Sequence, residues 1–96
     1  MILEAAFLQV KAGRELEFEA AFKMASPLIA AQKGYIQHSV QRCLEQTGKY
    51  LLLVEWDTLE DHTGGFRGSS EYLEWKALLH HFYDPFPVVE HFERVL

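Results

Sequence analysis

The chain has 96 residues, of which 49% are hydrophobic and 24% are charged, and its formal net charge at pH 7 is −5. This length corresponds to a single domain, residues 1–96, and this composition is typical of a soluble globular protein. No apolar run approaches the roughly 20 residues that span a membrane. The negative charge excludes the electrostatic attraction on which nucleic-acid binding depends. We therefore expect neither a membrane nor a nucleic acid as a partner.

Cys43 is the only cysteine, so an internal disulfide is excluded. The N-terminus has neither a basic region nor a small-residue cleavage site typical of a signal peptide. Both features favour a reducing, cytoplasmic location.

The first half of the chain predicts a strand, a helix and a second strand. The apolar segment Ile2–Val10 is short and bounded by turn residues, which favours a strand. A helix is predicted next, because the following apolar residues share one helical face: Phe18, Ala21, Phe22, Ala25 and Ile29. Pro27 is expected to kink this helix or to end its regular part. Gly34 is the expected C-cap, and the alternation in Tyr35–Cys43 predicts the second strand.

The second half predicts a strand, two helices and a final strand. Tyr50–Asp57 is the strongest strand, since it is apolar on both faces for most of its length. A short helix is expected to begin at Thr58 and to be stopped by three glycines, which are Gly64, Gly65 and Gly68. Ser69 or Ser70 can cap a second helix, whose apolar stripe comprises Tyr72, Trp75, Leu79 and Phe82. Two prolines exclude helix after this point, and Val88–Leu96 is the predicted last strand.

The predicted order βαββαβ is the ferredoxin-like arrangement of the α+β class, an antiparallel four-stranded sheet with both main helices on one face. The other face of the sheet would then be open to solvent. On the third strand Leu51 and Leu53 point to the side opposite Leu52, Val54 and Trp56, so both faces carry apolar groups. Two helices cannot cover both faces, and we expect the second face to pack against another copy of the chain in a two-fold homodimer.

The histidines do not have the spacing of a metal site. His80 and His81 are adjacent, so on a helix they point about 100° apart, and no H-x-x-x-H or C-x-x-C pattern is present. Cys43 has no histidine at a diagnostic spacing and is interpreted as a small apolar residue. No metal ion and no other cofactor is therefore expected.

Aromatic residues and histidines concentrate in the second half of the chain. This half contains nine of the 13 aromatic residues and four of the five histidines. Trp56 at a strand end could fill the core or form the wall of a site for a flat aromatic ligand. His62 and Arg67 follow that strand in a glycine-interrupted stretch, where a histidine can take up a proton near neutral pH and an arginine can bind an anion.

Four segments of this region closely resemble the antibiotic biosynthesis monooxygenase domain family: Leu53–Trp56, Leu59–His62, Phe66–Ser69 and Tyr72–Trp75. The resemblance runs from the first strand to Val89. It implies a dimeric α+β barrel, with Trp56 and His62 at the family's usual pattern positions. Characterised oxygenases of the family oxidise phenols or quinols with O₂ and without metal or flavin, while other members degrade haem or act on small signalling molecules. The haem-degrading members use an asparagine on the first strand, and this chain has Phe7 there and no asparagine at all.

The resemblance implies a cofactor-independent monooxygenase that acts with O₂ on a small, flat aromatic or quinol-type molecule. Trp56 would stack on the substrate, His62 or His38 would act as the base, and Arg67 and Tyr72 would hold polar groups. The complete set of candidates adds further substrate-binding residues: Phe66, His81 and Tyr83. His38 can equally be a half-buried, hydrogen-bonded structural residue. The alternative function is a homodimer of the same fold that binds a small metabolite or isomerises it without O₂.

Overall fold

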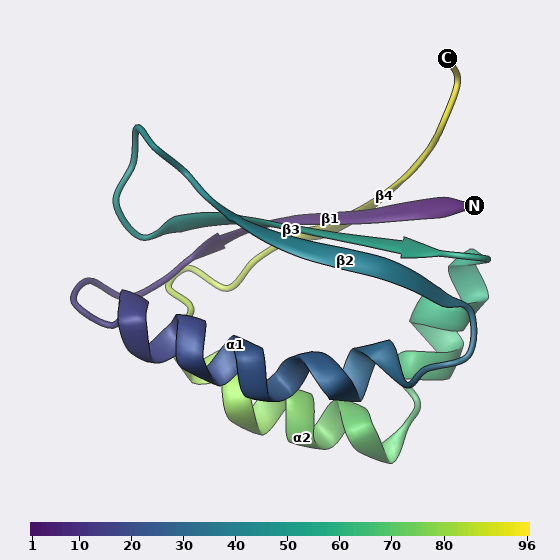
Figure 1. The fold of residues 1–96 in the computed structure, drawn as a ribbon, viewed down its shortest axis with the longest axis horizontal. Helices are drawn as coiled ribbons and strands as arrows, with labels where there is room; N and C mark the ends of the chain where they lie inside the picture. Colours follow the sequence, from purple (N-terminus) through teal and green to yellow (C-terminus); the bar gives the residue numbers. More distant parts are fainter.

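The computed structural model describes residues 1–96 and contains a four-stranded antiparallel sheet covered by helices on one face (Figure 1). The strand order is β2-β3-β1-β4. The strands are β1 (Ile2–Gln9), β2 (Tyr35–Arg42), β3 (Lys49–Trp56) and β4 (Val89–Glu93). The helices are α1 (Glu15–Ala30), the π-helix η1 (Asp61–Phe66), α2 (Ser70–Leu79) and the 3₁₀-helix η2 (His80–Phe82). The predicted α+β, ferredoxin-like arrangement is confirmed.

The core lies between the sheet and the two main helices. Strand β3 alternates between the buried side chains of Tyr50, Leu52, Val54 and Trp56 and half-buried side chains on the opposite face. Helix α1 buries its predicted face, with Phe18, Phe22, Ala25 and Ile29 all in the core. Helix α2 contributes Trp75, whose ring meets that of Phe22 edge-to-face with 5.2 Å between the centroids. Strand alternation and helical periodicity thus converge on one apolar layer.

Two predicted boundaries are wrong. Helix α1 does not end at Pro27 but continues to Ala30, and the Pro27 carbonyl accepts a hydrogen bond from the Ala31 N–H. Strand β4 is five residues long, since only Val89–Glu93 pair with β1.

The glycines after β3 also act differently from the expectation. Gly64 and Gly65 lie inside η1 and do not end it. The wide turn of η1 is closed by a hydrogen bond from the Arg67 N–H to the His62 carbonyl at 3.1 Å. Gly68 follows, and a Cβ there would stand only 2.5 Å from the Gly64 carbonyl oxygen. Glycine is therefore required at position 68 by a close backbone approach.

No other element covers the face of the sheet opposite the helices (Figure 1). This face carries apolar side chains. The strand register places Phe7 opposite Leu51, Ala5 opposite Leu53 and Leu3 opposite Phe92 on this face. Phe7 is 62% exposed and Phe92 is 50% exposed. We call these residues the open sheet face. In the chain as a whole, no helix is long and apolar enough to cross a membrane.

Candidate active site

A cavity of about 350 Å³ lies between the sheet and the segment that runs from η1 to β4. Its wall is formed by β1 and β3 on one side and by η1, α2 and the residues that follow α2 on the other. The lining residues are Glu4, Ala6, Leu8, Leu52, His62, Phe66, Arg67, Tyr72, Trp75, His80, Tyr83, Phe86, Pro87 and Val89. Aromatic and aliphatic groups dominate this wall, and a few polar groups converge on it, as in a site for a small organic ligand.

Glu4 is the buried acid of this cavity. Alternation along β1 places it on the same face as Ala6 and Leu8, and it is only 4% exposed. Its Oε1 accepts a hydrogen bond of 2.9 Å from the indole Nε1–H of Trp56. Burial raises the pKa of the Glu4 carboxyl above its ordinary value, although the Trp56 hydrogen bond and the positive charge of Arg67 act in the opposite direction. Glu4 can therefore both lose and accept a proton closer to neutral pH than an exposed glutamate can.

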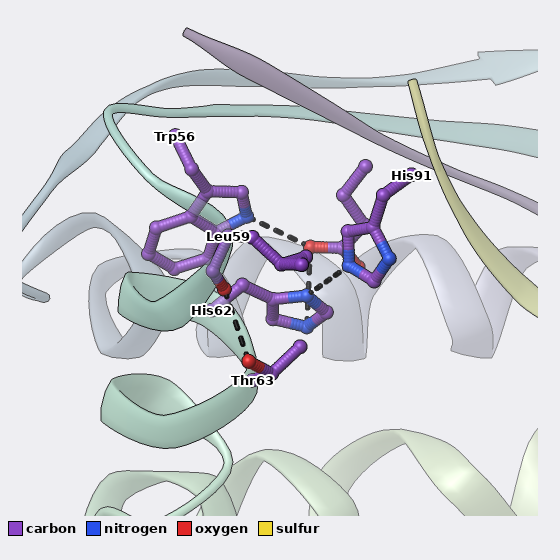
Figure 2. Close-up of polar contacts among 6 residues, drawn as sticks. Trp56, Leu59, His62, Thr63 and His91 are labelled. Carbon is purple, nitrogen blue, oxygen red and sulfur yellow. Dashed lines mark hydrogen bonds and ion pairs between the residues drawn. The ribbon is translucent and has the colours of Figure 1, made fainter. Parts of the chain in front are cut away.

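His62 is stacked on Trp56 and connects Glu4 to His91 (Figure 2). The rings of His62 and Trp56 are 5.4 Å apart with an interplanar angle of 17°. His62 Nε2 lies 3.3 Å from Glu4 Oε1, and His62 Nδ1 lies 2.7 Å from His91 Nε2. Burial, with smaller effects of the charges of Arg67 and His91, lowers the pKa of His62 to about 3. The imidazole of His62 is therefore neutral near pH 7, and its contact with Glu4 is a close approach of two polar groups and not an ion pair.

The opposite wall of the cavity offers polar groups that have no partner within the protein. Arg67 follows η1, is exposed at the cavity and forms no ion pair. Tyr72, His80 and Tyr83 also line the cavity. Burial lowers the pKa of His80 and raises that of the Tyr83 hydroxyl, so both are neutral near pH 7. This wall can therefore donate hydrogen bonds to a ligand and, through Arg67, bind its negative charge.

The structure brings together five of the eight predicted site residues. His62, Phe66, Arg67, Tyr72 and Tyr83 all line the cavity. Trp56 does not line it, because its side chain is fully buried behind His62. His81 is exposed, packs against Phe82 and also lies outside the lining.

His38 lies in a different cavity, of about 500 Å³, between α1 and β2. There its Nδ1 is within 2.5 Å of the Tyr35 hydroxyl, and its Nε2 is 3.1 Å from Ser26 Oγ. Two charged groups of that cavity bind each other, since Glu19 accepts hydrogen bonds from Arg42 and from Tyr50, whereas Lys23 also lines it without such a partner. We favour the cavity at Glu4 as the active site because it combines a buried acid with polar side chains, such as Arg67 and Tyr83, that have no partner within the protein.

The sequence analysis missed two residues, Glu4 and His91, and considered His80 only within the wider set of aromatic residues and histidines of the second half of the chain. A signal for Glu4 was available, because it shares the strand parity of Ala6, Leu8 and Val10, all of which are core residues. Neither cavity nor surface contains three or more His, Cys, Asp or Glu residues grouped so that they could hold a metal ion.

Comparison with known proteins places the chain in a family. Residues 1–78 match the family model described as antibiotic biosynthesis monooxygenase. The chain belongs to this family. The "Uncharacterized protein YczJ" of Bacillus subtilis (strain 168) is 67% identical over 95 residues, which cover 99% of this chain and 100% of that protein.

Solved structures of monooxygenase-family proteins have the same fold. The "Putative antibiotic biosynthesis monooxygenase" from Bordetella bronchiseptica superposes with a TM-score of 0.94 at 35% identity, covering 99% of this chain and 97% of that one. SnoaB, a cofactor-independent oxygenase from Streptomyces nogalater, has a TM-score of 0.85 at 16% identity, over 99% of this chain and 93% of that one. At that identity the likeness to SnoaB extends to the fold alone. The predicted family is thus confirmed.

Proposed function

We propose that this protein is a cofactor-independent oxygenase that uses O₂ to oxidise a small, flat phenol or quinol. The observation that carries this proposal is the cavity at Glu4, in which a buried acid faces unpaired hydrogen-bond donors across an aromatic wall. Its volume of about 350 Å³ is at the small end of ligand sites and suits one or two fused rings. Phe66 and Tyr72 would contact the ring faces, and Arg67 would stabilise the negative charge of the ionised phenol.

The chemistry needs little beyond proton removal and exclusion of water. A phenol that loses its proton becomes an electron donor, and one electron passes to O₂ to give a substrate radical and superoxide. Their combination forms a C–O bond and a hydroperoxide. Loss of the ring proton and cleavage of the O–O bond then leave a quinone and one water molecule. All four electrons that reduce O₂ come from the substrate, so no further reductant is consumed.

Oxygen uptake tests this proposal. We expect 1-naphthol or a related phenol to cause oxygen consumption with one quinone formed per O₂, measured with an oxygen electrode and by absorbance. Arg67→Gln removes the positive charge at the cavity and should raise KM about tenfold, because a charge-assisted contact to the phenolate is lost. Arg94→Gln, which changes an exposed arginine outside the cavity, should have no effect. Substrate conversion without oxygen consumption would instead favour the isomerase alternative.

We also propose that two copies of the chain associate through the open sheet face. On this face Phe7 is 62% exposed and Phe92 is 50% exposed, and both lie beside Leu51 and Leu53. Light scattering after size exclusion should give about twice the chain mass of 11.1 kDa. Leu53→Glu should give the mass of a single chain, because it would bury a charge in the interface. Leu73→Glu places the same change on the exposed side of α2 and should leave the mass doubled. A single-chain mass for the unmodified protein would contradict the proposal.

A further inference from the structure

The cavity of about 500 Å³ between helix α1 and the edge strand β2 is separate from the candidate active site (Figure 1). Helical spacing places Glu19, Lys23 and Ser26 on the side of α1 that lines it. Strand alternation places Val40 and Arg42 on the facing side of β2. The two cavities share no lining residue, so a ligand can occupy this one while a substrate is bound in the other.

The hydrogen bonds around His38 fix its ring as one wall of this cavity. The Ser26 hydroxyl donates to the Phe22 carbonyl oxygen at 2.9 Å, which leaves Ser26 Oγ to accept the Nε2–H of His38, 3.1 Å away. The other ring nitrogen, Nδ1, accepts the Tyr35 hydroxyl at 2.5 Å. Burial lowers the pKa of His38, so this neutral form is present near pH 7. Both ring nitrogens are thus used within the protein, and what His38 offers a ligand is the surface of its ring.

The charged side chains give this cavity a net positive charge. Lys23 and Arg42 are cationic, and Glu19 is the only acid in the lining. The hydrogen bonds that Glu19 accepts from Tyr50 and from Arg42 lower its pKa and keep it ionised near pH 7. Arg42 uses one terminal nitrogen for Glu19 and retains further N–H donors, while Lys23 has no ion pair within the protein. These donors can bind an anion, although the net charge of the whole chain is −5.

We propose that this cavity is a second binding site and that its ligand is a small organic anion, a carboxylate attached to an aromatic ring system. The carboxylate binds Lys23 of α1 and Arg42 of β2, which line the cavity from its two sides. The rings lie against Val40, the ring of His38 and the accessible part of Phe22. The volume of about 500 Å³ suits one or two fused rings. This site does not depend on the proposed function, because none of its residues lines the candidate active site.

Nuclear magnetic resonance with 2-naphthoate as the probe tests the location of this site. At pH 7 the probe should shift the backbone amide signals of α1 around Lys23 and of β2 around Val40, and the size of these shifts against probe concentration gives a Kd. Lys23→Gln removes one positive charge and should raise this Kd about tenfold. Lys33→Gln makes the same change at an exposed residue outside the cavity and should leave the Kd unchanged. Shifts confined to η1 and α2, or the same Kd for both variants, would overturn the proposal.

The chemical class of the ligand is tested with three further probes in the same titration. 2-Naphthamide has the same rings without the charge, whereas acetate and inorganic phosphate have negative charge without the rings. Each should bind at least tenfold more weakly than 2-naphthoate, because the site combines a charge-assisted contact with burial of apolar surface. Equal binding of 2-naphthamide would show that the charge has no role, and equal binding of acetate or phosphate would show a site for inorganic or minimal anions. Either result would refute the proposal, and neither depends on oxygen uptake.

Discussion

Trp56→Phe is expected to lower the free energy of unfolding by about 3 kcal/mol. Two losses combine in this figure. The smaller ring leaves part of a fully buried site empty, which costs roughly 1–2 kcal/mol in a protein core. The indole N–H that binds Glu4 is also removed, and loss of a hydrogen bond to a buried acid costs roughly 1.5–3 kcal/mol. Urea denaturation of the two proteins at pH 7 measures the difference.

A double-mutant cycle separates these two losses. In a Glu4→Leu background the acid that needs the indole N–H is absent, so Trp56→Phe should cost only the packing loss. We expect the cost to fall by at least 1 kcal/mol in this background, because removal of both hydrogen-bond partners avoids an unsatisfied buried group. Identical costs in the two backgrounds would show that the hydrogen bond at 2.9 Å does not contribute to stability.

Acid is expected to destabilise the protein through His62. The ordinary pKa of histidine is 6.5, and the folded structure lowers that of His62 to about 3. Between these values the unfolded chain binds a proton that the folded protein does not, so stability falls as the pH is lowered below 6.5. At pH 4 the loss amounts to on the order of 3 kcal/mol, from 2.5 pH units at 1.36 kcal/mol each.

Thermal melts from pH 7 to pH 4 of the wild-type protein and His62→Gln check this expectation. The melting temperature of the variant should fall less than that of the wild-type protein over this range, because glutamine does not titrate. Glu4 acts in the opposite direction in both proteins: its raised pKa means that the folded state retains a proton above pH 4.5, so its contribution to stability declines as the pH rises through the folded value. Parallel pH profiles for the two proteins would show that His62 is protonated without penalty in the fold.

The fold could be predicted because its elements are short and strongly patterned. The face of α1 around Phe18 and Phe22 and the alternation of β3 both bury the residues that periodicity assigned to the core. The errors arose where backbone geometry departs from regular periods. Helix α1 continues beyond Pro27 to Ala30, and glycines that usually end a helix lie within the wide turn of η1.

The candidate site could be predicted only in part, because its contacts join residues distant in sequence. His62 and Arg67 were found from local signals in the segment after β3. Glu4 lies 52 residues before its hydrogen-bond partner Trp56, and His91 lies 29 residues after His62. These pairs depend on the sheet register, which no local pattern specifies. Trp56 was recognisable as important, but whether it faces a ligand or a buried acid is decided by that register as well.

The π-helical turn of η1 contains one residue more than an α-helical turn, so its presence can be recognised from the length of this segment in related sequences. A ring closed between residues five apart, such as the one from His62 to Arg67, holds one residue more than an α-helical ring. Deletion of one residue at Thr63 would restore ordinary α-helical winding and leave the sheet and α2 unchanged. The Arg67 N–H would then close an α-helical ring on the same His62 carbonyl, so the two residues would keep nearly the same relative orientation. Homologues that lack this one residue would therefore retain the architecture with a narrower turn between His62 and Arg67, and a one-residue alignment gap would distinguish the two groups.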